Sequence, residues 1–330
     1  MNFFQTKGLL SKILILLTLF LATQMIKANN PCPKFHLHIM EECDACGCSN
    51  NGGSLGLGGV IENNFIGIRH LHQKHQSKDG IFDNSPTINE YFNTIQIWSR
   101  IPVIKDYLEA QIFMPIHFHQ RVYSNKTTKI DGLGDISFLV NYTLLNKNYS
   151  KYRKEKNKIF SYNHILKLGT GLKLPTGTFN ETINNAVNPS FQLGTGSIDF
   201  LASCQYIFKH NNFGATNYLN YFVKTKNSDQ YKFGNQFNFN STIFYAFEDV
   251  KKNKFVPSLG VSGEFYQPNE ILGIPIRITK GYAIFSNIGV EYNSKKITLG
   301  LLTMYPINQE LAQGTIQIKY RSSVYLNYNF

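Results

Sequence analysis

The sequence predicts an all-β protein that closes into a transmembrane antiparallel up-and-down β-barrel of about 12 strands. Three features predict this fold: alternating polarity recurs from Gly53 onward, the amino terminus resembles an export signal, and the last strand ends on the aromatic Phe330. Alternation gives each strand one apolar and one polar face, as a wall between lipid and a polar lumen requires.

The composition fits such a barrel better than a helical membrane protein or a nucleic-acid-binding domain. Charged residues make up 16% of the chain, against roughly a quarter in a typical soluble domain, and aromatic residues make up 14%. After the amino terminus, no apolar run reaches the roughly 18 residues of a membrane-spanning helix. The formal charge of +12 is spread through the expected loops, so we expect no nucleic-acid partner.

The amino terminus has the layout of a secretory signal peptide. Lys7 and Lys12 precede an apolar run over residues 13–22, and Ala28 offers a small residue for cleavage. We therefore expect a signal peptide over residues 1–28, a Cys- and His-rich periplasmic leader over residues 29–52, and the barrel over residues 53–330.

Strands are expected wherever alternating runs are bounded by turn-rich breaks. An even number of strands returns both chain ends to the periplasmic side, and the connections assigned to the external side are mostly longer. Residues 147–159 are the exception, long yet on the periplasmic side. The expected strands span residues 55–71, 88–103, 107–120, 134–146, 160–174, 191–208, 213–224, 232–246, 255–266, 282–292, 296–305 and 315–330.

Periodicity alone leaves a second fold class open. In residues 107–120, apolar side chains alternate with Glu109, Gln111 and His117. If the apolar faces met in a shared core, the product would be a large soluble β-sandwich. The export signal and the aromatic strand ends favour the barrel, in which apolar faces meet lipid and polar faces line the lumen.

The final strand gives the clearest two faces, and in a closed barrel it pairs with the first strand, near residues 57–68. One face is expected to meet lipid: Ile316, Ile318, Tyr320, Val324, Leu326, Tyr328 and Phe330. The opposite face contributes to a set of polar residues that we expect to line the lumen and set its selectivity. That set is Glu109, Gln111, His117, His119, Lys167, Lys173, Asp199, Glu264, Glu291, Lys319 and Arg321.

The leader contains the densest group of soft metal ligands in the chain. The candidate ligands for copper or zinc are His36, His38, Met40, Cys43, Cys46 and Cys48. Disulfide bonding is the alternative, because the periplasm is oxidising and Cys32 makes the number of leader cysteines even. Cys204 is expected to be an inert residue facing lipid.

A second group of histidines suggests a metal site at the barrel mouth. His70, His72 and His75 end the expected first strand, while His117 and His119 lie on the polar face of the third. The alternative, which base rates favour, is that these are scattered solvated or pore-lining histidines.

The sequence predicts no enzyme. It contains no Gly-x-Ser-x-Gly, no His-Glu-x-x-His and no phosphate-binding loop, and nothing in the sequence links its serines to its histidines.

Three glycine-rich motifs resemble an outer-membrane barrel family named for the meta-pathway of phenol degradation. They are Gly132-Leu-Gly-Asp135, Leu172-Lys-Leu-Pro-Thr-Gly177 and Gly194-Thr-Gly-Ser-Ile-Asp199. Their glycines and Pro175 are also explained as bends and strand ends. The end of the chain, from Tyr328 to Phe330, resembles the sorting signal that the barrel-assembly machinery reads.

The resemblance implies passive or facilitated transport of a small hydrophobic or aromatic solute across the outer membrane of a Gram-negative bacterium. The Cys and His clusters add a metal-linked solute as an alternative. Expected partners are outer-membrane lipid, the barrel-assembly machinery and the solute. The alternative function is a non-conducting binding or structural barrel, with copper or zinc held by the leader.

Overall fold

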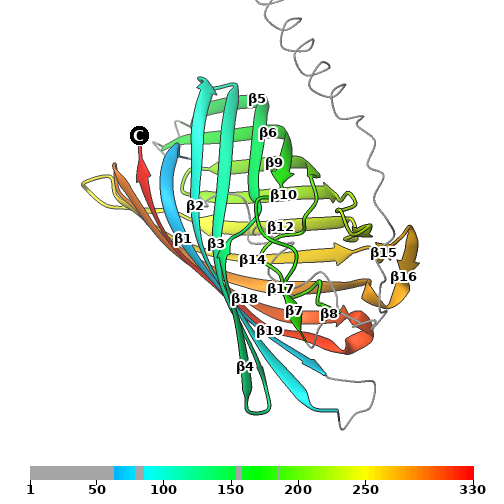
Figure 1. The fold of residues 1–330 in the computed structure, drawn as a ribbon. Helices are drawn as coiled ribbons and strands as arrows, with labels where there is room; N and C mark the ends of the chain where they lie inside the picture. Colours follow the sequence, from blue (N-terminus) through cyan, green and yellow to red (C-terminus); the bar gives the residue numbers. More distant parts are fainter. Residues whose placement is uncertain (1–62, 79–84, 154–157, 184–185) are drawn as a thin grey trace, which may run out of the picture. The chain divides into compact units, whose positions relative to one another are not determined.

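The structure, a computed structural model, describes residues 63–78, 85–153, 158–183 and 186–330. These residues form a closed barrel of twelve antiparallel strands, in which each strand pairs with the next along the chain (Figure 1). Closure comes from β1 (Phe65–Lys78) pairing with β19 (Ile316–Asn329), with Ile68 opposite Leu326. The predicted fold class and strand number are confirmed.

The ten other wall strands lie between β1 and β19 in chain order. They are β2 (Thr87–Ile104), β3 (Leu108–Tyr123), β5 (Ile136–Arg153), β6 (Lys158–Leu174), β9 (Asp199–His210), β10 (Phe213–Val223), β12 (Gln236–Tyr245), β14 (Lys254–Tyr266), β17 (Gly281–Asn293) and β18 (Ile297–Leu311).

Shorter elements lie at the two ends of the barrel. No helix among the described residues is long and apolar enough to cross a membrane. The short elements are β4 (Lys126–Leu133), β7 (Thr182–Ile183), β8 (Ala186–Val187), β11 (Tyr231–Lys232), β13 (Phe247–Glu248), β15 (Asn269–Ile271), β16 (Ile274–Ile276) and two 3-10 turns, Arg277–Thr279 and Ala312–Gly314.

Side chains alternate between the two faces of the wall. In β1, Arg69 and Gln73 are buried inside, while Ile66 and Ile68 are 52% and 58% exposed on the outside. Similar exposed apolar residues continue around the barrel, for example Leu259 and Ile288 on adjacent strands. An outer surface of this kind is stable when hydrocarbon covers it, which identifies the wall as membrane-spanning.

A β-bulge in β19 corrects the predicted faces of the final strand. Lys74 pairs with Tyr320 and His75 with Ile318, so Lys319 is an extra residue that inverts the alternation. Ile318 and the neighbouring Ile316 are therefore buried rather than lipid-facing. Lys319, predicted to line the lumen, instead donates a hydrogen bond to the exposed Gln317.

Beyond the bulge the predicted faces hold. Val324, Leu326 and Tyr328 are exposed on the outer surface, while Arg321 is buried inside the wall. Phe330 is also exposed. A role for the last residues in assembly stays a prediction.

Several other predicted strand ends differ from the structure. The first strand was expected over residues 55–71, but β1 runs to Lys78, and residues 55–62 lie outside the described part of the chain. The strand expected over residues 191–208 begins only at Asp199. Residues 191–198 are instead part of a loop whose side chains are largely buried.

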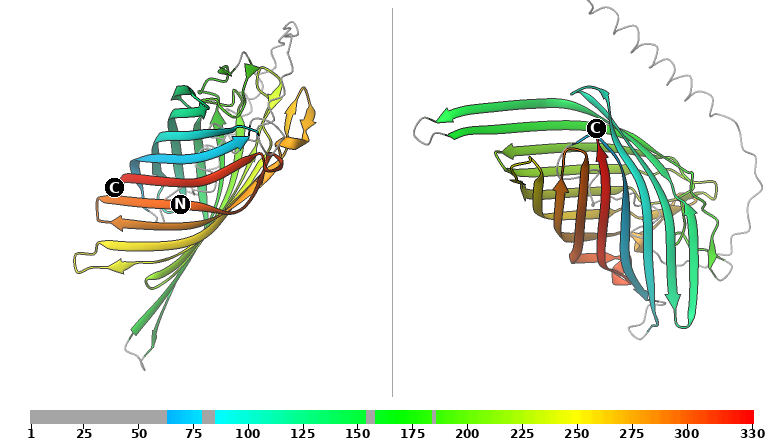
Figure 2. Two further views of the ribbon diagram at one scale, coloured as in Figure 1. Left: turned by 90° about the horizontal axis from the view of Figure 1, so that it is seen from below. Right: turned by 90° about the vertical axis from the view of Figure 1, so that its left-hand side faces the viewer.

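The two ends of the barrel differ in their connections. Short turns at residues 105–107, 211–212 and 294–296 lie at the end where the amide of Phe330 contacts Asn64. Longer connections, 175–198, 224–235 and 267–280, lie at the opposite end, which is therefore the external one. The predicted exception at residues 147–159 is mostly strand, because β5 and β6 stay paired to Arg153 and Lys158 beyond their neighbours (Figure 2).

The lipid-facing surface can be tested at Ile288, an exposed residue within β17. Ile288→Arg should lower the free energy of unfolding by about 2–4 kcal/mol if the residue lies near the bilayer midplane, because a guanidinium must then face hydrocarbon. Urea unfolding in lipid vesicles measures this. The control is Val250→Arg, at an exposed apolar residue in the turn between β13 and β14, where little change is expected. Equal effects of the two variants would contradict the assignment.

Candidate functional site

The connection between β6 and β9, described over residues 175–183 and 186–198, folds into the barrel lumen. Its Phe191 is fully buried, with its ring 6.2 Å from that of Phe92 and 6.4 Å from that of His119, both on the wall. Leu193 belongs to the same buried cluster. Other buried side chains of the connection are Asn188, Ser190, Gln192, Thr195 and Ser197. We call residues 175–198 the inward loop.

The inward loop is shaped by its own hydrogen bonds. The amide of Gln192 donates to the backbone oxygens of Glu181 at 2.7 Å and Asn188 at 2.8 Å, and accepts from the Glu181 N–H at 3.0 Å. Asn188 Oδ1 in turn accepts from the N–H and the hydroxyl of Ser190. Because the Gln192 amide and the Asn188 Oδ1 are paired, burying these groups inside the lumen carries little desolvation cost.

Asp135, immediately before β5, fixes the inward loop to the wall. Its Oδ2 accepts hydrogen bonds from the N–H and the hydroxyl of Thr195, both at 2.9 Å, and its Oδ1 accepts from the N–H of Gly177 at 3.0 Å. The two ends of the loop are thus held by one carboxylate, which is fully buried. Charge-assisted hydrogen bonds of this kind are about twice as strong as neutral ones.

Two lysines compensate the buried carboxylates. Lys173 Nζ lies 2.8 Å from Asp135 and 2.7 Å from Asp199, and Lys224 Nζ lies 3.1 Å from the same oxygen of Asp199. The Lys173 ammonium also bonds to the Thr195 hydroxyl. We call these five residues the latch. Its two carboxylates balance its two ammonium groups, so neutralising one of the four would leave a buried charge uncompensated.

The glycines of the motifs permit the close packing of the latch. A Cβ atom on Gly194 would lie 2.6 Å from the backbone oxygen of Gly177, and it would also collide with the Asp135 carboxylate. No side chain fits there without a backbone shift. The three motifs singled out in the sequence therefore meet in one place, where they anchor the inward loop.

Two further external connections, residues 224–235 and 267–280, pack together with the inward loop. Phe179 of the loop contacts Tyr231 and Phe233, with ring centroids 6.0 and 5.8 Å apart. Asn269, from the connection after β14, donates to the Tyr231 hydroxyl at 2.6 Å and accepts from the N–H of Gly234 at 2.8 Å. These contacts link three of the external connections to one another.

Below the inward loop the lumen contains apolar side chains that the sequence reasoning missed. Phe65 and Trp98 pack edge to face with centroids 4.6 Å apart, and Trp98 packs in the same way on Tyr325 at 5.5 Å. The full cluster, which we call the aromatic belt, is Phe65, Trp98, Phe113, Leu139, Leu201, Tyr218, Phe222 and Tyr325. It was missed because we expected lumen-facing positions to be polar.

Charged groups border the aromatic belt. The Arg69 guanidinium lies 4.5 Å above the Trp98 ring and donates to Gln96 at 3.1 Å. The Tyr325 hydroxyl donates to Glu291. The lumen wall thus combines aromatic faces with a guanidinium and a carboxylate at the same level.

A direct ion pair joins β14 and β19 inside the barrel. Arg321 Nη1 donates to Glu264 at 2.7 Å and its guanidinium lies 4.7 Å above the Phe285 ring. The Tyr266 hydroxyl donates to the same carboxylate. Both charges are buried and directly paired, so this ion pair links β14 to β19 inside the barrel.

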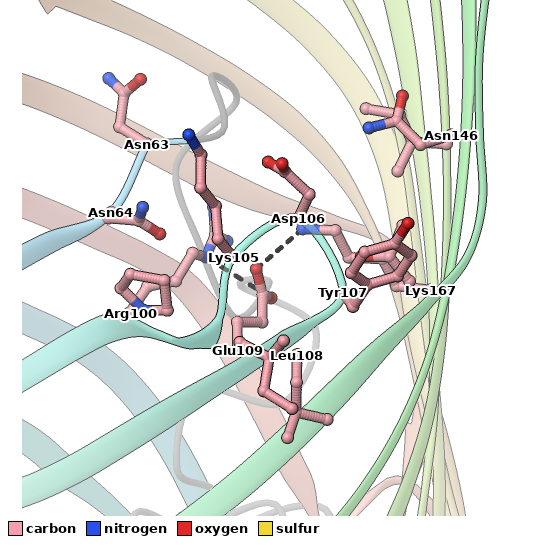
Figure 3. Close-up of a pocket in the computed structure, with 14 residues that line it drawn as sticks. Asn63, Asn64, Arg100, Lys105, Asp106, Tyr107, Leu108, Glu109, Asn146 and Lys167 are labelled. Atoms are coloured by element: carbon pink, nitrogen blue, oxygen red, sulfur yellow. Dashed lines mark hydrogen bonds and ion pairs between the residues drawn. The ribbon is translucent and has the colours of Figure 1, made fainter. Parts of the chain in front are cut away.

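At the periplasmic end, a pocket of about 480 Å³ opens between the turn after β2 and the strands β5 and β6. Glu109 is its centre: Lys167 Nζ lies 2.8 Å from one carboxylate oxygen, and Arg100 Nε lies 3.8 Å from the other (Figure 3). Asn141 and Gln111 also donate to Glu109, at 3.0 and 3.1 Å.

The structure places ten of the eleven predicted lumen residues inside the wall with buried side chains, and Lys319 is the one that it does not. It brings Lys167 to Glu109 in the pocket, where Gln111 also donates to Glu109, and it brings Lys173 to Asp199 in the latch. Their part in transport stays a prediction.

The histidines do not form the ring suggested by the sequence. His117 and His119 are buried inside with ring centroids 4.5 Å apart, and His75 is also inside, but His70 and His72 lie on the opposite face of β1. Within the described ranges no group of three or more His, Cys, Asp or Glu residues could hold a metal ion.

The remaining cysteine predictions have different outcomes. Cys204 pairs with Leu168 and Leu219, which are exposed on the outer surface, as expected of a lipid-facing residue. The candidate metal ligands of the leader, residues 29–52, lie outside the described residues.

Comparisons with known proteins agree with this architecture. Residues 70–309 match the protein family described as putative MetA-pathway of phenol degradation. The structure of an outer membrane channel from Pseudomonas putida F1 is similar with a TM-score of 0.57 and 13% identity, covering 83% of this chain and 98% of the channel. At that identity the likeness shows a shared fold.

A weaker similarity is to the β domain of the Bordetella autotransporter BrkA, with a TM-score of 0.45 and 11% identity, covering 82% of this chain and all of that one (100%). The comparison with curated proteins gives no match.

The latch can be tested by Asp135→Asn. Loss of the carboxylate charge should release the inward loop and lower the free energy of unfolding by about 3–5 kcal/mol, because the Asn NH2 group would face the N–H of Gly177 or Thr195 and Lys173 would keep only Asp199 as a counter-ion. Chymotrypsin should then cut after Phe179 or Phe191 in the folded protein, which urea unfolding and mass spectrometry would measure.

The matched control is Asp249→Asn, the same substitution in the exposed turn before β14. It should leave the inward loop resistant to chymotrypsin. If Asp135→Asn were cut no faster than this control, the latch would not hold the loop.

Proposed function

The chain belongs to the family that its residues 70–309 match, and from this membership and the lumen geometry we propose passive transport of small solutes across the outer membrane. The observation that carries the proposal is the aromatic belt inside the barrel, between the inward loop and the periplasmic pocket. A lumen with apolar faces and flanking charges offers contacts to a solute that has both an apolar body and a polar group.

The order of the layers supports a route for the solute. The inward loop and its latch form the external layer, the aromatic belt follows, and the pocket at Glu109 opens to the periplasm. Contacts spread over several layers favour conduction, since each is weak enough to release the solute to the next.

A non-conducting barrel is the second candidate, and the buried inward loop is the observation that favours it. Twelve strands enclose a narrow lumen, which loops and side chains can fill. The two functions differ in one measurable property, which is steady ionic current through a single reconstituted molecule.

A planar lipid bilayer containing the purified full chain should therefore show steady single-channel current in potassium chloride. Absence of current from protein that migrates as a folded, heat-modifiable barrel would support the non-conducting barrel and overturn the proposal.

Leu139→Trp tests whether the route passes the aromatic belt. Leu139 is buried in the belt, so a larger ring should narrow the lumen there and reduce conductance severalfold. The control is Phe138→Trp at the preceding residue, which is exposed on the outer face. An unchanged conductance in Leu139→Trp would exclude the belt from the route.

A further inference from the structure

The periplasmic pocket contains a buried guanidinium that lacks a hydrogen-bonded counter-ion among the described residues. We propose that Arg100 and this pocket bind the carboxylate of a small aromatic acid whose ring lies against the aromatic belt. The inference rests on the proposed transport function and names the solute class that the periplasmic half of the lumen selects.

Arg100 is held inside the wall. The residue is 2% exposed, and its Nε and Nη1 atoms are buried without a hydrogen-bond partner in the described part of the chain. The nearest carboxylate oxygen, on Glu109, is 3.8 Å from Nε, which is beyond hydrogen-bonding distance. A buried guanidinium in this state gains most from an acceptor that enters the pocket.

Glu109 is already engaged by other donors. Lys167 donates to one oxygen at 2.8 Å, while Asn141 and Gln111 donate to the other at 3.0 and 3.1 Å. With its oxygens saturated from these directions, Glu109 neutralises Lys167 but forms no hydrogen bond to Arg100. Glu109 therefore balances the charge of Lys167, and the positive charge of Arg100 remains unbalanced at the pocket.

The rest of the pocket does not cancel that charge. Its lining includes the adjacent Lys105 and Asp106, whose opposite charges balance (Figure 3). Counted together, the cations Arg100, Lys105 and Lys167 face two carboxylates. The pocket thus carries a net positive charge and attracts an anion.

The apolar side of the site begins at the same guanidinium. Arg100 Cζ lies 5.8 Å from the centre of the Phe65 ring, which packs on Trp98 at 4.6 Å. A ligand with its charge on Arg100 would therefore place its body against the belt. The pocket volume of about 480 Å³ lies within the range of small-molecule sites.

The chemistry of the donor favours a carboxylate on a ring. A guanidinium presents its N–H groups in one plane, which matches the two oxygens of a carboxylate. An aromatic ring then gains edge-to-face contacts with the belt that an inorganic anion lacks. Benzoate is the simplest probe with both parts, and benzamide is the uncharged probe of the same shape.

Trp98 gives a direct readout of binding, because it is the single tryptophan of the chain and belongs to the belt. Titration of the detergent-solubilised full chain should change its fluorescence saturably with benzoate and much more weakly with benzamide. Arg100→Gln should weaken benzoate binding roughly tenfold or more, because a charged hydrogen bond is lost. Arg100→Lys should retain part of the affinity.

Arg121→Gln is the matched control. Arg121 is also a buried cation of the lumen wall, but it lies near the external end of β3, whereas Glu109 lies near the periplasmic end. This variant should bind benzoate like the unaltered chain. Glu109→Gln should bind benzoate more tightly, since it removes the competing negative charge.

Equal affinity of the unaltered chain for benzoate and benzamide, or an unchanged benzoate affinity in Arg100→Gln, would overturn the inference. If Arg100→Gln did not fold, the inference would be overturned by a Glu109→Gln variant that binds benzoate no more tightly than the unaltered chain. The same samples separate this inference from the transport proposal. Steady current without benzoate preference defeats only the anion site, and benzoate preference without current defeats only transport.

Discussion

The buried carboxylate of Asp135 is the interaction on which the arrangement of the lumen depends. It receives hydrogen bonds from both ends of the inward loop and an ion pair from Lys173, at distances between 2.8 and 3.0 Å. Without it, the loop would have to leave its buried polar groups unpaired or move out of the barrel. The position of Phe191 against the wall follows from this anchor, because the backbone on both sides of it is fixed.

The two halves of the lumen are held by different interactions. Toward the external end, ion pairs and hydrogen bonds satisfy one another, so the latch is rigid and electrically balanced. Toward the periplasm, the side chains of the aromatic belt pack against one another, and Arg100 Nε and Nη1 have no acceptor within the described ranges. This difference supports our proposal that the periplasmic half of the lumen sets the choice of solute.

Much of the wall was predictable from sequence, because alternation at a period of two depends on neighbouring residues only. The bulge at Lys319 was not, since an extra residue leaves the local pattern plausible while it inverts the faces before it. The latch could not be predicted from sequence either, because Asp135 and Thr195 are 60 positions apart and only the closed barrel brings them together. The motifs marked the residues, but their glycines could be explained as bends.

Hydrogen–deuterium exchange of the unaltered protein tests most directly whether the inward loop is a fixed part of the lumen. The amides of Gly177 and Thr195 donate to Asp135 and should exchange as slowly as those of the wall strands. The fully exposed Val250, in the turn before β14, supplies the fast reference in the same sample. Exchange at Gly177 and Thr195 as rapid as in that turn would contradict this account.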